Sequence, residues 1–119
     1  MKKKVLIVDD EPNILMSLDF LMKKNGYDVF IARDGEEALH MINREKPGTI
    51  ILDIMMPKVD GYEVCQYVKQ HDEFASIKVI FLSAKSKESD IQKGYDMGAD
   101  LYLTKPFSTR TLVEKVESL

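Results

Sequence analysis

The chain has 119 residues, a length typical of one domain, and its 45% hydrophobic and 31% charged residues exclude a wholly disordered chain. Its net charge of −3, from 17 basic and 20 acidic residues, gives no sign of the clustered positive charge of a nucleic-acid-binding surface. No apolar run approaches the roughly 20 residues of a membrane span, and a single cysteine, Cys65, excludes an internal disulfide and favours a cytoplasmic location.

Short apolar runs alternate with amphipathic stretches along the chain. Runs that are rich in β-branched and aromatic residues, and too short for helices, predict five strands, at residues 5–8, 28–32, 49–52, 77–82 and 101–104. The first, third and fourth runs are apolar on both faces, which is typical of central parallel strands covered on each side.

Helical periodicity fills the intervals between these runs. Pro12 suits the first turn of the first helix, and Gly26 follows its expected end. Asp34 and Ser108 are expected to cap the second and last helices, and Asp60 begins a turn and a helix. Core-facing residues are expected to include Leu112, Val113, Val116 and Leu119 in the last helix, Cys65 in the third, and Met16, Met22, Met41 and Met97.

The weakest predicted helix lies between Glu88 and Met97. Its apolar stripe is thin, and it contains Gly94, which costs about 1 kcal/mol relative to alanine. We expect this segment to be the least stable element and the one most able to move.

The whole pattern is therefore βα repeated five times. Such alternation indicates a doubly wound α/β fold, in which a five-stranded parallel sheet with right-handed crossovers lies between two layers of helices. One domain is expected over residues 1–119.

Functional groups in open α/β sheets collect beyond the carboxyl ends of the strands. The polar residues that follow the five runs are Asp9, Asp10 and Glu11; Arg33 and Asp34; Asp53; Ser83 and Lys85; and Lys105. Crowded carboxylates repel one another unless a cation neutralises them, and oxygen ligands without nearby His or Cys favour Mg²⁺ over zinc or copper.

A phosphoryl group is the natural partner for such a site. An ammonium such as Lys105 and a hydroxyl such as Ser83 can hold phosphoryl oxygens. A carboxylate can also act as the nucleophile and form an aspartyl phosphate. Asp53 is the best candidate, because apolar Leu52 and Ile54 fix it at the tip of a buried strand.

Five motifs in order resemble those of the receiver domain of two-component response regulators, close to the chemotaxis regulators. They are Val5-Leu-Ile-Val-Asp-Asp-Glu-Pro12, Ile50-Ile-Leu-Asp-Ile-Met-Met-Pro57 with Asp60-Gly61, Leu82-Ser-Ala84, Gly98-Ala-Asp100 and Lys105-Pro-Phe107. The resemblance spans essentially the whole chain. It implies a flavodoxin-like three-layer sandwich with strand order 2-1-3-4-5.

The resemblance also implies a role for each site residue. Asp53 would accept the phosphoryl group, while Ser83 and Lys105 would bind it. Tyr102 would act as an aromatic switch, and the Lys105–Pro106 peptide would be cis. The implied metal is Mg²⁺, with Mn²⁺ as a substitute, and its implied ligands are Asp10, Asp53, the backbone carbonyl of Met55 and, through water, Asp9.

The implied partners are a sensor histidine kinase or phosphotransfer protein and a downstream effector, with no direct contact to nucleic acid or membrane. A phosphorylation-dependent homodimer is left open. Signalling would pass through the fourth helix, fifth strand and fifth helix. The domain would be a switch with slow self-catalysed phosphorylation and dephosphorylation, and not an enzyme. Met55 and Lys85 would tune the loss of phosphate, and their bulk and charge predict a long-lived phosphoform.

Each site residue also has a simpler explanation when taken alone. Asp9 and Asp10 could belong to a solvated turn, Ser83 could cap a helix, Lys105 could be a surface lysine, and Tyr102 could be a half-buried strand aromatic. Only their combination favours a phosphoryl site.

Three other functions compete with that of a receiver. A haloacid-dehalogenase-like phosphatase needs a second acid two residues after its nucleophile, where this chain has Met55, and carries that nucleophile on the first strand. A flavodoxin-like cofactor binder needs a phosphate loop after the first strand, where Asp9 and Asp10 would repel phosphate. A phosphorylation-independent receiver-like binding module would not need the acids together with Ser83 and Lys105.

Overall fold

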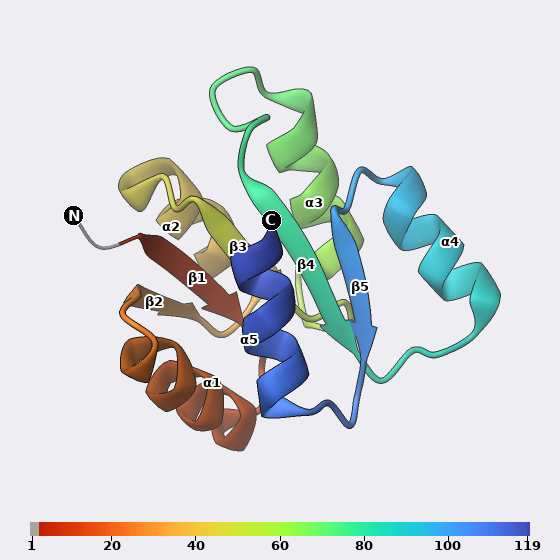
Figure 1. Cartoon of the computed structure of the whole chain (residues 1–119). Coiled ribbons are helices and arrows are strands. Elements are labelled where there is room, and N and C mark those ends of the chain that lie inside the picture. Colours follow the sequence, from red (N-terminus) through yellow and green to blue (C-terminus); the bar gives the residue numbers. More distant parts are fainter. Residues whose placement is uncertain (1–2) are drawn as a thin grey trace.

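The computed structural model describes residues 3–119 and consists of strands and helices in alternation (Figure 1). The elements are β1 (Lys4–Val8), α1 (Pro12–Lys24), β2 (Asp28–Ala32), α2 (Gly35–Glu45), β3 (Thr49–Leu52), α3 (Gly61–Gln70), β4 (Lys78–Ser83), α4 (Glu88–Asp96), β5 (Leu101–Thr104) and α5 (Thr109–Ser118). The second, third and fifth strands have the predicted bounds, whereas β1 begins one residue earlier and β4 lies one residue later.

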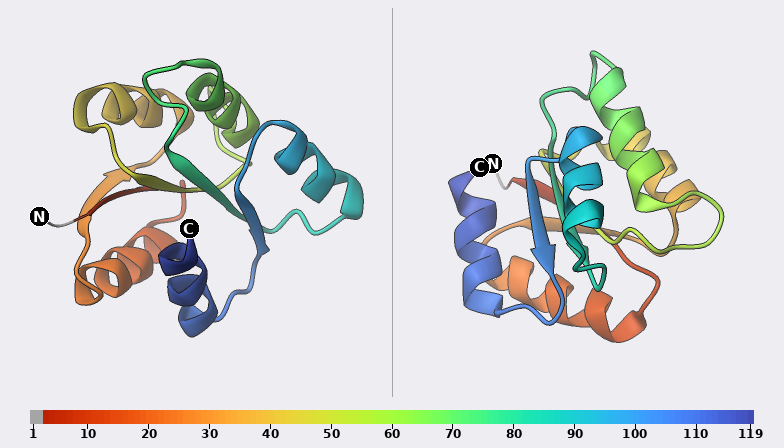
Figure 2. Two further views of the ribbon diagram at one scale, coloured as in Figure 1. Left: turned by 45° about the horizontal axis from the view of Figure 1, so that its top comes forward. Right: turned by 90° about the vertical axis from the view of Figure 1, so that its right-hand side faces the viewer.

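The strands form one parallel sheet in the order β2-β1-β3-β4-β5. Figure 2 shows α1 and α5 on one face of this sheet and α2, α3 and α4 on the other. The predicted three-layer, doubly wound sandwich is confirmed. In the part of the chain that the structure describes, no helix combines the length and the apolar character needed to cross a bilayer.

Two apolar cores, one on each face, explain why the central strands are apolar throughout. Along β1, Leu6 and Val8 pack against the α2–α3 side, whereas Val5 and Ile7 pack against α1 and α5. Successive side chains of a strand point to opposite faces, so both cores draw on the same short run. Cys65 is fully buried in the α3 layer, as predicted.

Local capping fixes where the helices begin and end. The Asp34 carboxylate accepts a hydrogen bond from the backbone N–H of Glu37 at 2.8 Å, and Asp60 and Ser108 cap α3 and α5 in the same manner. Gly26 follows α1 with a φ of +88°, a conformation that glycine adopts without steric cost. These helix boundaries bring the loops after β1 and β3 to the same edge of the sheet.

Two residues predicted to face the core do not do so. Met16 is 70% exposed, because Leu15 and Leu18 turn toward the sheet and the two residues between them, Met16 and Ser17, point away from it. Leu119 is 40% exposed, since α5 ends one residue earlier and the helical periodicity no longer places it. Met22 is buried as predicted.

The fourth helix is the most weakly anchored, in agreement with its thin apolar stripe. Gly94 is its only buried residue, and no side chain caps its first turn. A Cβ at Gly94 would lie 2.8 Å from the ring of Tyr102, so the glycine lets α4 pack closely on β5. That α4 is the element most able to move stays a prediction.

Candidate functional site

Three acids meet at the carboxyl edge of the sheet. Asp9 and Asp10 follow β1 and Asp53 follows β3, and one carboxylate oxygen from each lies within 4.8 Å of the others. Asp9 and Asp53 are buried, whereas Asp10 is exposed. Neighbouring parallel strands therefore bring together acids that are far apart in the chain.

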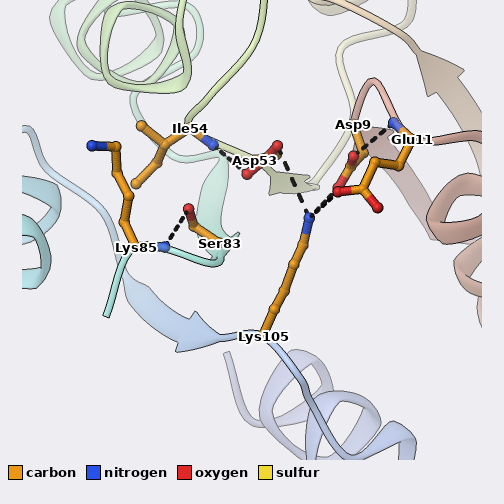
Figure 3. A network of polar contacts seen from close by, with 7 residues as sticks. All are labelled: Asp9, Glu11, Asp53, Ile54, Ser83, Lys85 and Lys105. Atoms are coloured by element: carbon orange, nitrogen blue, oxygen red, sulfur yellow. Dashed lines mark hydrogen bonds and ion pairs between the residues drawn. The ribbon is translucent and has the colours of Figure 1, made fainter. Parts of the chain in front are cut away.

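Lys105 reaches into this cluster from the loop after β5 (Figure 3). Its Nζ donates a hydrogen bond to Asp9 Oδ2 at 2.9 Å and lies 3.6 Å from Glu11 Oε1 and 4.0 Å from Asp53 Oδ2. Burial lowers the pKa of Lys105, but the hydrogen bond to Asp9 and the neighbouring carboxylates outweigh it and raise that pKa above its ordinary value. Its side chain is only 13% exposed, so it is no ordinary surface lysine.

Asp53 is held by its own loop. Its Oδ1 accepts a hydrogen bond from the backbone N–H of Ile54 at 2.8 Å, which leaves Oδ2 on the side of Lys105. Burial raises the pKa of Asp53 to about 6; Lys105 lowers that pKa, whereas Asp9 and Asp10 raise it. Asp53 is therefore charged at neutral pH, but Lys105 offsets only part of the cost of burying that charge.

Ser83 ends β4 beside these residues and is buried. Its Oγ accepts a hydrogen bond from the backbone N–H of Lys85 at 3.2 Å, which ties it to the loop that leads to α4. Tyr102 lies on the neighbouring strand with its ring turned inward and only 8% exposed, and its hydroxyl donates to the Lys85 carbonyl at 2.7 Å. Tyr102 is thus buried rather than half-exposed, and it contacts the same loop as Ser83.

A pocket opens beside the acids. Met55, Met56, Lys85 and Lys93 are among the residues that line it, with Asp10 at its rim. Met55 is 61% exposed, and Lys85 lies 3.9 Å from the carboxylate of Asp90. The two residues predicted to tune phosphate loss therefore border the site, although the Met55 side chain extends largely into solvent.

The backbone around the site is closely packed. Gly61 begins α3 against the segment that carries Asp53: its N–H donates to the Ile54 carbonyl at 2.9 Å, and a Cβ there would overlap the carbonyl oxygen of Asp53. This packing fixes the direction in which the segment that carries Asp53 enters the cluster. On the far side, the Lys105–Pro106 peptide is cis.

The donor set suits a magnesium ion. Asp9, Asp10 and Asp53 offer only oxygen ligands, of which hard divalent cations take several at once. The lysine ammonium, which contacts Asp9 most closely, leaves the exposed carboxylate of Asp10 accessible to a hydrated ion. The residues present therefore fit Mg²⁺.

Two contacts of the site were not predicted from the sequence. The ion pair between Glu11 and Lys105 follows from the fold, since the sequence marks Glu11 only as one of three acids after the first strand. The Ile54 N–H donor to Asp53 is a backbone group, and no side-chain pattern indicates it. Asp34 also follows a strand, but it takes the other role predicted for it: it caps α2, and its carboxylate lies 3.9 Å from the Lys58 ammonium.

Comparisons with known proteins point to one family. A family model described as the response regulator receiver domain matches residues 5–117. The alkaline phosphatase synthesis transcriptional regulatory protein PhoP of Bacillus subtilis (strain 168) is 44% identical over 119 residues, which cover 100% of this chain and 49% of PhoP. The chain thus spans about half the length of this relative.

Solved structures agree with the sequence match. The chemotaxis response regulator CheY4 of Vibrio cholerae superposes with a TM-score of 0.93 at 30% identity, over 99% of this chain and 98% of CheY4. The receiver domain of the Francisella response regulator 1452 gives a TM-score of 0.91 at 35% identity, over 98% of this chain and 95% of that one.

Proposed function

The chain belongs to the response regulator receiver domain family of two-component signalling, and within this family we propose that it is switched by a phosphoryl group accepted on Asp53. The observation that carries the proposal is the environment of Asp53: a buried carboxylate, flanked by two other acids and faced by the Lys105 ammonium. The haloacid-dehalogenase-like alternative is not favoured, because its second acid is replaced by Met55.

The transfer follows from the two oxygens of Asp53. The Ile54 N–H holds Oδ1, so Oδ2 is the oxygen that attacks phosphorus. As the new O–P bond forms, the P–N bond of a phosphohistidine donor breaks and its electron pair returns to the imidazole. Lys105, on the Oδ2 side, neutralises charge on the phosphoryl oxygens, and the Ser83 hydroxyl donates to one of them.

Mg²⁺ would be held by Asp10, Asp53 and the backbone carbonyl of Met55, with Asp9 contributing through water. When bound, the ion neutralises the crowded carboxylates and the oxygens of the incoming group. Lys105, which lies 2.9 Å from Asp9 Oδ2 and 4.0 Å from Asp53 Oδ2, would pair with the phosphoryl group on Asp53. Mn²⁺, which also takes oxygen ligands, is expected to substitute.

The output would leave the site through β4 and β5. Ser83 and Tyr102 both hydrogen-bond the residue 85 backbone, so a shift of Ser83 toward phosphate alters the loop that Tyr102 holds. The surface formed by α4, β5 and α5 would then change its shape. The weak anchoring of α4 supports this direction, because a switch needs an element with two accessible positions.

The partners would be a sensor histidine kinase or phosphotransfer protein upstream and an effector domain or protein downstream. PhoP is described as a transcriptional regulator, which favours an effector that acts on transcription. We propose that this domain itself does not contact nucleic acid. A phosphorylation-dependent homodimer remains an alternative partner arrangement. Slow self-catalysed phosphorylation and dephosphorylation would complete the cycle.

The test is phosphorylation by acetyl phosphate with Mg²⁺, followed by intact-protein mass spectrometry. We expect a gain of one phosphoryl group that is lost in Asp53→Asn and in the presence of EDTA. Asp72→Asn, at an exposed acid away from the site, is the matched control and should be phosphorylated like the wild type. A mass increase that persists in Asp53→Asn would overturn the assignment.

The lifetime of the phosphoform has its own test. Met55→Asn places a small polar side chain beside Asp53, and we expect it to shorten the phosphoform lifetime. A Met55→Asn variant that loses phosphate no faster than wild type would contradict the role given to Met55.

A further inference from the structure

Tyr62, the second residue of α3, is placed directly by the segment that carries Asp53. Its neighbour Gly61 is bonded to the Ile54 carbonyl at 2.9 Å and packs against the backbone of Asp53 without space for a Cβ. Any displacement of the residues after β3 must therefore carry the first turn of α3 with it. Tyr62 itself is only 7% exposed, so its ring is packed within the molecule between α3 and α4.

Helices α3 and α4 lie on the same face of the sheet (Figure 2). The Tyr62 side chain extends from α3 to the first turn of α4. Its hydroxyl donates to the Asp90 carbonyl at 3.1 Å, a contact that spans 28 residues. A helical carbonyl has two lone pairs, so this bond adds to the helix and does not replace its own hydrogen bonding. The Lys93 ammonium lies 4.4 Å from the centre of the Tyr62 ring, at a distance suited to cation–π attraction.

Besides these contacts, the first turn of α4 is held mainly by Ile91, which is partly buried and packs against the core. Lys87, at its N-cap position, forms no side-chain cap, and Gly94 is the only buried residue of the helix. The ion pair between Lys85 and Asp90 is long, at 3.9 Å, and partly exposed, so it adds little. Tyr62 is thus a principal tether of this turn.

The same ring also joins an aromatic row beneath α4. Tyr62 packs edge-on against Phe81 with ring centres 5.6 Å apart, and Phe81 packs against Tyr102 at 5.8 Å. Gly94 of α4 lies over the Tyr102 ring. The row therefore connects α3, β4 and β5 under the helix that it helps to hold.

We propose that Tyr62 is a positioning residue through which the segment carrying Asp53 sets the position of the first turn of α4. This route is separate from the one through Ser83 and Tyr102, because it starts on the β3 side of the site. The proposal rests on the proposed function only for the event that moves the segment; the tether itself is independent of phosphorylation.

The experiment compares Tyr62→Phe with Tyr67→Phe by amide hydrogen exchange in the unphosphorylated chain. Each variant loses one hydroxyl from α3; that of Tyr67 contacts Asn43 on α2 and not α4. The amides of Asp90 and Ile91, which both donate to the Lys87 carbonyl, report on the first turn of α4. We expect them to exchange about fivefold faster in Tyr62→Phe, the factor for one net hydrogen bond of about 1 kcal/mol.

Exchange at these two amides should stay at the wild-type rate in Tyr67→Phe, and both variants should unfold in urea at similar midpoints. Equal exchange rates of the Asp90 and Ile91 amides in the two variants would overturn the proposed role of Tyr62 as a tether of α4.

A second arm adds acetyl phosphate and Mg²⁺ and follows the α4 amides by NMR. Tyr62→Phe should take up phosphate at the wild-type rate, yet show a smaller chemical-shift change in α4 than wild type. A full-sized change would overturn the coupling role. Failure of wild-type phosphorylation would refute the proposed function alone, because the exchange arm does not depend on it.

Discussion

Replacing Asp53 with asparagine should stabilise the metal-free domain at neutral pH. Burial raises the pKa of Asp53 from 3.8 to about 6, so the folded state holds its ionised form less favourably than the unfolded state does. A tenfold change in proton affinity corresponds to about 1.4 kcal/mol, and the rise to about 6 therefore sets an upper limit of about 3 kcal/mol. Asp10, one of the charges that raise this pKa, is exposed, and water screens its repulsion of Asp53. We therefore expect Asp53→Asn to raise the free energy of unfolding by about 1–2 kcal/mol.

The direction of the effect follows from how the contribution of Asp53 to the free energy of unfolding changes with pH. Between about pH 4 and pH 6 the folded chain binds more protons at Asp53 than the unfolded chain, so this acid's contribution to the free energy of unfolding falls as pH rises. The uncharged amide introduced by Asp53→Asn does not titrate and carries no such dependence. The advantage of Asp53→Asn should therefore be largest above about pH 7 and nearly vanish near pH 4.

The measurement is urea unfolding in EDTA at these two pH values. The chain has no tryptophan, so far-UV circular dichroism serves as the probe. Asp72→Asn removes the same charge from an exposed position and controls for the change in net charge. A variant Asp53→Asn no more stable than wild type at neutral pH, or equally favoured at both pH values, would refute the electrostatic reasoning.

Three further substitutions test helix packing and helix capping. Gly61→Ala should destabilise the domain by about 2 kcal/mol or more in thermal unfolding, because its Cβ meets the backbone of Asp53; an unchanged Tm would show that α3 can shift freely. Gly94→Ala should lower stability by about 1 kcal/mol despite the better helix propensity of alanine, since its Cβ would lie 2.8 Å from the Tyr102 ring. Near-UV circular dichroism should report the displaced ring, and a gain in stability would contradict this expectation. Asp34→Ala should cost about 1 kcal/mol in urea unfolding through the lost cap, whereas Asp34→Asn should retain most of it.

The architecture could be predicted because its signals are local. The run 49–52 is apolar on both faces, and a central strand is the element that buries both. The side chains that follow the strands could be placed at one edge for the same reason, since parallel strands end together. Gly94 was predicted as a weakness, and the structure adds its reason in the ring of Tyr102.

What escaped prediction depends on contacts between distant segments. Helical periodicity places Met16 next to the buried stripe but does not show which neighbours the fold leaves uncovered. The bond from Tyr62 to the Asp90 carbonyl requires α3 and α4 to lie side by side, and a backbone acceptor leaves no mark in the sequence. The Ile54 N–H that holds Asp53 is hidden in the same way.

The pairing of Lys105 with Asp9 spans 96 residues, and this has a consequence for the order of events during translation. Because synthesis runs from the N-terminus, the ribosome releases Asp9, Asp10 and Asp53 long before their ammonium partner. A nascent chain that has made only β1 to β3 carries repelling carboxylates that water or free cations must screen. Lys105 can pair with Asp9 only after β5 has emerged from the ribosome, so this ion pair forms only once all five strands of the sheet have been synthesised.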